Sequence, residues 1–358
     1  MVDPVTSILS KTVERIIGSP LIAFLEQHGY GKAQWAFRKK SSAKDFVTLC
    51  MAKWILLICQ GHKIGLYLSD MSAAFDKVSR TLILGKLSQL GLPSTFIDFL
   101  SSYLLPREGR ARVEGALSDV MLLVDMVFQG TVLGPSLWNS FFGDVADAVP
   151  VGMQQINLFA DDLTVMTSVP QASSSALLTE VLEEAQSRTH LWGVKNQMQF
   201  DSSKEYFKML HPSLGSGEDF KLLGTLIDCQ LNMQACIESL LCKIRPKIRA
   251  LLRLQHLYSP ATMLDQNKSH VWNVKEYPNG ALIMAAPRQL RRLDKVQRWY
   301  LHELALTDTD AFIKYNFAPP SLRRAIGMLG FIHKRTLGFV IHFLFSNKVY
   351  LEGSYSIS

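Results

Sequence analysis

The sequence predicts a mixed α/β (α+β) fold, in which an antiparallel sheet with packed helices is followed by a mainly helical C-terminal region. Short apolar runs rich in strand formers end at acidic residues, and stretches with apolar residues at helical spacing separate these runs. Beyond residue 229 the pattern is helical almost throughout. With 358 residues, 48% of them hydrophobic, the chain is long enough for two packed units, which we place at 1–229 and 230–358.

Helices are expected over 6–27 and 43–60, where apolar residues recur at helical spacing. On the first helix one side is formed by Ile8, Leu9, Val13, Ile16 and Ile17. The apolar run from Ile64 is expected to be a strand that leads out to Asp70. A helix over 79–104, interrupted at 91–93, a strand over 121–128 and a helix over 136–149 that begins after Pro135 complete this part.

Strand-like runs at 156–160 and 163–166 flank Asp161-Asp162, which predicts a β-hairpin with both carboxylates at its tip. A helix from Ser175 to about Gln197 follows. The turn-rich segment 211–217 precedes a strand pair over 220–227, and helices are expected from there to about residue 347.

Composition argues against several classes of protein. The five cysteines are odd in number and form no Cys-x-x-Cys pair, so neither a disulfide framework nor a zinc site is indicated. The opening residues lack a basic stretch before an apolar core, and the most apolar run, 54–59, is too short to span a bilayer. We therefore expect an intracellular protein of the nucleus or cytoplasm, with no membrane partner and no evident targeting signal.

The net charge of +7 is unevenly distributed along the chain. Residues 241–358 hold 18 Lys and Arg against 7 Asp and Glu, a balance of +11, which leaves −4 for residues 1–240. A basic part beside an acidic centre indicates a surface for phosphate backbones next to a metal site. The alternative is that these cations merely solvate helix faces.

Asp70, Asp161 and Asp162 are candidate metal ligands. Adjacent carboxylates between apolar strands cannot both stay ionised without a counter-charge, although a solvated turn is the simpler alternative. Oxygen ligands with no His or Cys nearby suit Mg²⁺ or Mn²⁺. Two such ions about 3.5–4 Å apart can activate a hydroxyl nucleophile and stabilise a leaving pyrophosphate. The pattern therefore predicts metal-dependent nucleotide polymerisation with two ions.

Five segments in a fixed order resemble the palm motifs of reverse transcriptases, in particular those of the non-LTR, LINE-like retrotransposon type. They span 70–78 (DMSAAFDKV), 128–142 (FQGTVLGPSLWNSFF), 159–165 (FADDLTV), 192–204 and 220–228 (FKLLGTLID). Residues 34–39 are similar to that family's fingers motif, and residues 293–297 to a segment of its thumb. The resemblance implies a right-hand polymerase, with partial fingers and palm to residue 229 and a helical thumb after it.

The resemblance also implies catalytic roles. Asp70 and Asp161 would bind both metal ions, with Asp162 completing the acidic cluster and the backbone carbonyl of Met71 as a further ligand. Lys204 would donate a proton to the leaving pyrophosphate as a general acid. A surface lysine is the alternative for Lys204.

Substrate contacts are implied in the same way. Phe75 would lie under the incoming sugar and select deoxynucleotides, unless it is an ordinary core aromatic. Gln129 and Gly130 would line the nucleotide pocket, and Arg38 would contact the triphosphate or template unless it is simply solvated. The primer and template would be held by a set downstream: Leu223, Gly224, Lys243, Arg245, Lys247, Arg249 and Arg253.

The implied reaction is RNA-templated DNA synthesis from dNTPs on a DNA primer, with an endonuclease or an RNA-binding protein supplied by another chain. Two departures bear on activity, because residues 3–6 stand where an arginine-proline motif is typical and Glu205 stands where threonine is usual. One alternative is therefore a truncated, catalytically inactive retroelement remnant that only binds nucleic acid. Another is a group II intron maturase-type enzyme, although no maturase-like segment follows.

Overall fold

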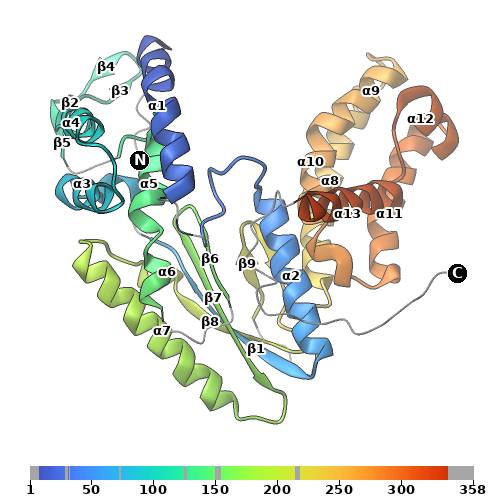
Figure 1. Ribbon diagram of the computed structural model, residues 1–358. Helices are drawn as coiled ribbons and strands as arrows, with labels where there is room; N and C mark the ends of the chain where they lie inside the picture. Colours follow the sequence, from blue (N-terminus) through green and yellow to red (C-terminus); the bar gives the residue numbers. More distant parts are fainter. Residues whose placement is uncertain are drawn as a thin grey trace, which may run out of the picture.

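The structure is a computed structural model that describes residues 8–28, 31, 33–71, 74–124, 127–149, 155–213 and 218–337. Figure 1 shows a sheet at the base, an N-terminal helical group at upper left and a C-terminal helical group at upper right. The upper-left group consists of α1 (Ile8–His28), α3 (Arg80–Gln89), α4 (Ser94–Tyr103) and α5 (Gly134–Phe142). The predicted mixture of helix and antiparallel sheet is confirmed.

A four-stranded antiparallel sheet has the order β6-β7-β1-β8. Its strands are β1 (His62–Ser69), β6 (Gln155–Phe159), β7 (Asp162–Pro170) and β8 (Tyr206–Leu210). Ser69 of β1 lies opposite Leu163 of β7, and Ile64 lies opposite Leu210 of β8. The predicted hairpin is confirmed with Phe159 opposite Asp162, so Ala160 and Asp161 form its two-residue turn.

Both faces of β1 are buried, which explains its continuous apolar sequence. Ile64, Leu66 and Leu68 belong to the buried cluster that includes α2 (Ala43–Cys59), whereas Tyr67 belongs to the cluster that includes α7 (Ser175–Lys195). Side chains alternate along a strand, so the two helices cover opposite faces. Each helix starts at a serine whose hydroxyl accepts a backbone N–H, Ser42 for α2 and Ser174 for α7.

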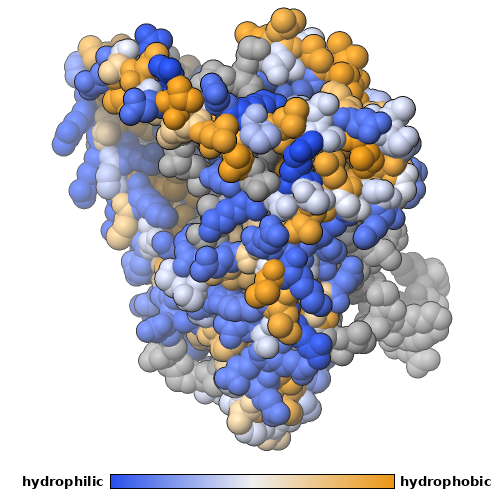
Figure 2. Space-filling model, turned by 90° about the vertical axis from the view of Figure 1, so that its left-hand side faces the viewer, coloured by the Kyte–Doolittle hydropathy of each residue, from blue (hydrophilic) through white to orange (hydrophobic). Residues whose placement is uncertain are grey.

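Helix α1 forms where expected, but its apolar side is exposed. Ile8 is 86% exposed and Ile16 is 72% exposed, while the buried stripe consists of Glu14, Gly18, Leu21 and Leu25. Gly18 permits this packing, because a Cβ there would lie 2.7 Å from Cδ2 of Leu133 at the start of α5. Figure 2 shows the side of the molecule that carries α1, and hydrophobic side chains gather along its upper edge.

Short elements between α4 and α7 differ in detail from the prediction. The strand expected over 121–128 is limited to β5 (Met121–Leu123), and residues 125–126 lie outside the described residues. The helix expected over 136–149 divides into α5 and α6 (Val145–Ala148). The unpredicted strands β2 (Arg107–Gly109), β3 (Arg112–Val113) and β4 (Ala116–Leu117) complete two hairpins, in which β2 pairs with β5 and β3 with β4.

The C-terminal third begins with the predicted strand pair, β9 (Phe220–Leu222) and β10 (Thr225–Ile227). The expected boundary at 229/230 falls in the turn that follows β10. The remaining helices are α8 (Gln234–Leu252), α9 (Pro260–Asn267), α10 (Asn273–Glu276), α11 (Pro287–Glu303), α12 (Asp308–Tyr315) and α13 (Pro320–Thr336), with a π-helical turn at Lys268–Trp272. None of the helices among the described residues is long and apolar enough to cross a membrane.

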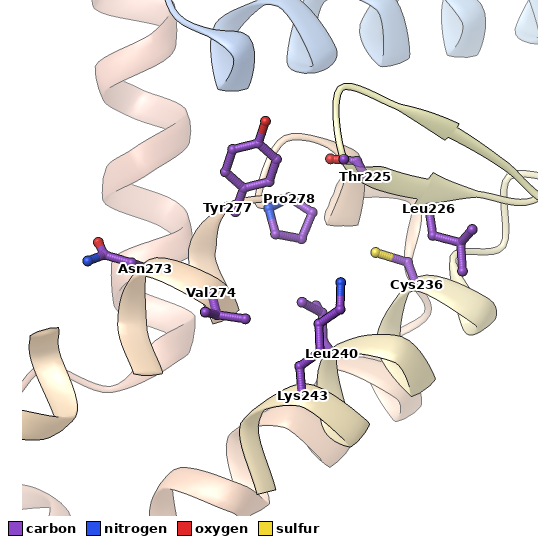
Figure 3. A pocket seen from close by; sticks show the side chains of 10 residues that line it. Thr225, Leu226, Cys236, Leu240, Lys243, Asn273, Val274, Tyr277 and Pro278 are labelled. Atoms are coloured by element: carbon purple, nitrogen blue, oxygen red, sulfur yellow. The ribbon is translucent and has the colours of Figure 1, made fainter. Parts of the chain in front are cut away.

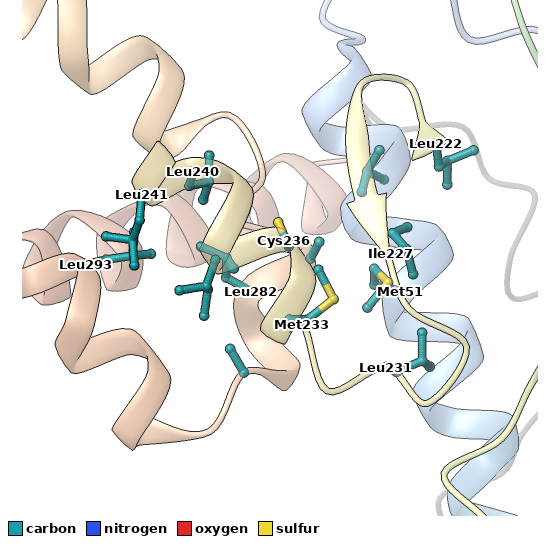
Figure 4. Packing of buried hydrophobic residues seen from close by; sticks show 14 of the residues in the cluster. Met51, Leu222, Ile227, Leu231, Met233, Cys236, Leu240, Leu241, Leu282 and Leu293 are labelled. Carbon is teal, nitrogen blue, oxygen red and sulfur yellow. The ribbon is translucent and has the colours of Figure 1, made fainter. Parts of the chain in front are cut away.

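One hydrophobic core joins the sheet to these helices. Figure 4 shows Met51 of α2 and Ile227 of β10 beside Met233, which directly precedes α8, with Leu293 of α11 on the far side of α8. All four side chains are fully buried. The helices after β10 are therefore packed against α2 and the strand pair through a shared apolar core.

Candidate active site

The three predicted aspartates lie together at one end of the sheet. Asp70 follows the last residue of β1, Asp161 is in the β6–β7 turn, and Asp162 begins β7. Because Ser69 pairs with Leu163, the next pair in the antiparallel register is Asp70 with Asp162. Sheet pairing alone thus brings together residues that are about ninety positions apart in the sequence.

Lys204 joins this group from a 3₁₀ turn, Ser202–Lys204, just before β8. Its Nζ lies 2.7 Å from Oδ2 of Asp70 and 3.8 Å from Oδ2 of Asp201. The backbone N–H of Asp201 also donates to the carbonyl of Asp70 at 3.1 Å, which fixes this turn beside β1. The hydrogen bond and charge of Asp70 raise the pKa of Lys204, so its ammonium stays protonated at neutral pH.

The carboxylates carry more negative charge than Lys204 compensates. Burial, followed by the charges of Asp161 and Asp70, raises the pKa of Asp162 to about 7. Burial and the nearby Asp70 also raise the pKa of Asp161. Such shifts mean that a further positive charge at this position would be stabilising.

Divalent cations fit this group in donor type and in charge. The ligand atoms are carboxylate oxygens, which suit Mg²⁺ or Mn²⁺. Among the described residues, no three His, Cys, Asp or Glu side chains converge closely enough to form a ready-made metal cage. The Lys204 ammonium instead occupies one oxygen of Asp70. A bound cation would therefore compete with this ammonium for the carboxylate of Asp70.

The turn that carries Asp161 is held by two side chains that the sequence analysis did not single out as site residues. Ala160 has a left-handed φ of 56°. Its N–H donates to Oε1 of Gln34, and its carbonyl accepts from Nε2 of Gln34 and from Nε1 of Trp138, each at 3.0 Å. Gln34 and Trp138 are completely buried. Together they set the backbone from which Asp161 projects.

Phe75 lies beside this support. Its ring stacks on Trp138 with centroids 5.1 Å apart and meets the ring of Phe37 edge-on at 6.4 Å. Phe75 is partly buried and packs against the hydrophobic core. Met71, which follows Asp70, has a buried side chain and a backbone bridge to Phe200. Phe75 and Met71 thus both lie close to the aspartates in the chain and in the packing.

The Gln129-Gly130 turn lies just before α5, in the N-terminal helical group. Gly130 has a φ of 75°, a conformation that glycine adopts without strain. Nε2 of Gln129 lies 3.4 Å from Oδ1 of Asp76, just after Phe75. The buried carboxylate of Glu14 accepts the backbone N–H groups of Val132 and Leu133 at 2.6 and 3.3 Å. Glu14, another residue that sequence reasoning missed, therefore anchors this turn to α1.

Glu205, which stands where threonine is usual in the resembled motif, takes part in a hydrogen-bond network. Its carboxylate is 4% exposed and accepts hydrogen bonds from the hydroxyls of Tyr67 at 2.6 Å and Ser69 at 3.0 Å, with His190 at 2.9 Å on its outer side. Burial opposes ionisation, but these hydrogen bonds lower its pKa overall. Glu205 thus ties the end of β1 to α7, next to Lys204.

Two of the expected primer residues meet at one cavity. Leu223 and Gly224 form the β9–β10 turn, and the carbonyl of Leu223 accepts from the hydroxyl of Tyr277 at 2.6 Å. Gly224 and Lys243 both line a cavity of about 310 Å³ (Figure 3), which Tyr277 also borders. The turn, α8 and α10 are therefore brought together here.

The remaining expected contacts are dispersed. Arg245 and Arg249 face α11 and line a different hollow. Lys247 on α8 and Arg253 just after its end are exposed and line neither hollow. Arg38 donates to the carbonyl of Gly31 and lines a hollow beside the end of α1. The structure therefore does not place the five basic side chains of 243–253 on one face. The missing arginine-proline motif at residues 3–6 lies outside the described residues.

Comparison with known proteins settles the family. A sequence profile of the family "Reverse transcriptase (RNA-dependent DNA polymerase)" matches residues 4–225. The chain belongs to the reverse transcriptase family. It is 24% identical over 259 residues to the RNA-directed DNA polymerase from the mobile element jockey of Drosophila funebris, covering 67% of this chain and 28% of that protein. It is also 27% identical over 160 residues to a probable RNA-directed DNA polymerase from transposon X-element of Drosophila melanogaster, covering 44% and 18%.

These relatives confirm the expected likeness to polymerases of LINE-like elements, although the chain spans only about a quarter of the length of the jockey protein. The fold is also similar to that of apo telomerase from Candida tropicalis. The similarity covers 86% of this reverse transcriptase chain and 54% of the telomerase, with a TM-score of 0.50 and 11% identity. The right-hand palm and thumb expected from the sequence are thus confirmed at the level of fold.

Proposed function

We propose that this chain is an RNA-directed DNA polymerase that adds dNTPs to the 3′-hydroxyl of a DNA primer on an RNA template. The observation that carries the proposal is the assembly of Asp70, Asp161, Asp162 and Lys204 at one end of the sheet. Membership of the reverse transcriptase family supports the same reaction. The alternative of an inactive remnant is less favoured, because the acidic group and the lysine are both in place.

The aspartates would hold two Mg²⁺ or Mn²⁺ ions, with the Met71 carbonyl as a further ligand. When bound, these ions would supply the charge that activates the primer hydroxyl and stabilises the leaving pyrophosphate. Gln34 and Trp138 would keep Asp161 in place through the backbone of Ala160. Lys204, whose side chain is 53% exposed, would turn from Asp70 to the triphosphate and protonate the leaving group.

Substrate selection would depend on the rings and turns around this centre. Phe75, fixed by stacking on Trp138, would lie under the sugar and exclude a 2′-hydroxyl. Gln129 and Gly130 would line the nucleotide pocket. The Leu223-Gly224 turn and Lys243 would hold the primer end, since they meet at one cavity. RNA template, DNA primer and dNTPs are thus the proposed partners.

The test is incorporation of dTTP by the purified chain on poly(rA) primed with oligo(dT), in Mg²⁺ and separately in Mn²⁺. Incorporation that stops when EDTA is added is the expected result. Binding of the hybrid with no incorporation in either metal would contradict the proposal and favour a remnant that only binds nucleic acid.

A further inference from the structure

A basic groove on the helical C-terminal region lies outside the group of aspartates. It runs between α8 and α11, encloses about 470 Å³, and is lined by Arg245, Arg249, Arg292, Lys295, Val296 and Trp299. We call these six residues the thumb groove. The last four belong to α11 and have no role in the proposed polymerase reaction. Each wall of the groove carries two cations.

The charge of the thumb groove is largely uncompensated. Nη1 of Arg292 binds Oε1 of Glu238 at 2.6 Å, and Arg245 is close enough to that carboxylate to lower its pKa. Within the described part of the chain, Arg249 and Lys295 form no ion pair. Four cations therefore line a groove that has two carboxylates beside it, Glu238 at Arg292 and Glu303 at Trp299, and this excess of positive charge favours an anionic occupant.

An aromatic ring and an apolar floor accompany these cations. Trp299 is partly exposed, and its Nε1 donates to Oε1 of Glu303 at 3.0 Å, which fixes the orientation of the indole. Val296 is 6% exposed and forms the floor between the helices. Cations that contact phosphates, combined with an aromatic ring for stacking, are the usual elements of a site for unpaired nucleic acid.

We propose that the thumb groove binds an unpaired RNA strand, with phosphates on Arg249 and Lys295 and a base stacked on Trp299. The volume of about 470 Å³ is that of a small-ligand pocket, so it has room for nucleotides of a single strand. RNA is the expected source, because unpaired template RNA accompanies the proposed polymerase reaction, and this assignment rests on that function. If the cations of α8 alone bound a duplex, the indole of Trp299 would not be required for binding.

The thumb groove is separate from the cavity where the primer end is expected. Lys243 lines that cavity with Gly224, whereas Arg245 and Arg249 line the thumb groove. The buried residues of α8, including Ile244 and Ile248, separate these two edges of the helix. The two sites can therefore be occupied at the same time by different segments of nucleic acid.

The test measures binding of a fluorescein-labelled uridine dodecamer to the full chain by anisotropy, without metal, dNTP or primer. Trp299→Ala should weaken binding by about 5- to 100-fold, whereas Trp299→Phe should retain most of the affinity. Lys295→Gln should lower the slope of log affinity against log salt by about 0.7. Lys195→Gln, an exposed charge on α7, is the matched control and should leave binding unchanged.

Further probes separate stacking from charge. An abasic RNA of equal length should bind more weakly than the dodecamer and respond little to Trp299→Ala. The proposal is overturned if Trp299→Ala and Lys295→Gln both bind like the parent, or if Lys195→Gln loses as much affinity as Lys295→Gln. Equal or tighter binding of a thymidine dodecamer would overturn the assignment to RNA. A chain that binds through Trp299 but does not extend a primer would refute only the polymerase function.

Discussion

At the scale of single residues, the position of Asp161 depends on one backbone carbonyl. Gln34→Glu removes the amide donor to Ala160 while keeping an acceptor for its N–H, and Trp138→Phe removes the indole donor while keeping an aromatic ring. Each variant should raise the Mg²⁺ concentration for half-maximal primer extension by about fivefold, equivalent to one hydrogen bond of ~1 kcal/mol. The double variant leaves the Ala160 carbonyl without a donor. It should raise the Mg²⁺ concentration for half-maximal extension by more than the product of the two single effects.

Initial rates of primer extension over a Mg²⁺ titration test this prediction. The melting temperature of each variant shows whether the substitution also lowers stability. A purely structural role would lower the melting temperature and the rate at all metal concentrations, with an unchanged metal dependence. That outcome would contradict the assignment of Gln34 and Trp138 as positioning residues for Asp161.

The protonation of Asp162 gives a pH-dependent prediction. Its pKa rises from 3.8 to about 7 on folding, so the folded chain holds this proton more tightly than the unfolded chain. Its contribution to stability is therefore present at low pH and is lost as the pH rises toward 7. In EDTA, Asp162→Asn should be more stable than the parent at pH 8 by about 1–2 kcal/mol, and the difference should shrink toward pH 5.

Urea unfolding at both pH values measures this difference, and Asp147→Asn, an exposed acid on α6, serves as the control. Equal stability of the parent and Asp162→Asn at pH 8 would contradict the prediction, because ionised Asp162 would then not destabilise the fold. Addition of Mg²⁺ should stabilise the parent more than Asp162→Asn, which keeps Asp70 and Asp161 but lacks one carboxylate of the group.

At the scale of elements, α1 is oriented by one buried acid. Glu14→Ala would leave the N–H groups of Val132 and Leu133 without their acceptor and should cost about 2–3 kcal/mol of stability. It should also raise the KM for dNTPs, because those residues follow the Gln129-Gly130 turn. Glu14→Gln keeps an acceptor oxygen and should lose less stability. Arg15→Ala, on the exposed side of α1, should change neither the stability nor the KM for dNTPs. An unchanged KM in Glu14→Ala would contradict the anchoring role.

The same helix shows where sequence patterns succeed and fail. The hairpin around Asp161 and the strand before Asp70 were predictable, because short apolar runs flanking acids occur in consecutive sequence. The exposed side of α1 was not, since Glu14 contacts backbone groups 118 residues away and that contact prevails over the apolar pattern. Gln34 was missed for the same reason, because its partner Ala160 is 126 residues distant.

At the scale of the whole molecule, the basic residues of α8 lie on two separate edges of this helix. The resemblance implied that the five basic residues of 243–253 would hold primer and template together. The structure divides this set, because the buried face of α8 packs between β10 and α11 and separates Lys243 from Arg245 and Arg249. Which face of a basic helix meets a partner depends on tertiary packing, which local periodicity does not specify.

The aspartates at the end of the sheet are proposed to hold the metal ions for nucleotidyl transfer. The most direct measurement is primer extension on an RNA template by the parent, by Asp161→Asn and by the control Asp147→Asn, at equal concentration of folded chain. Loss of extension in Asp161→Asn alone, with binding of the primer–template hybrid retained, is the predicted result. Extension by Asp161→Asn at the rate of the parent would contradict the account, because the reaction would then not depend on this carboxylate.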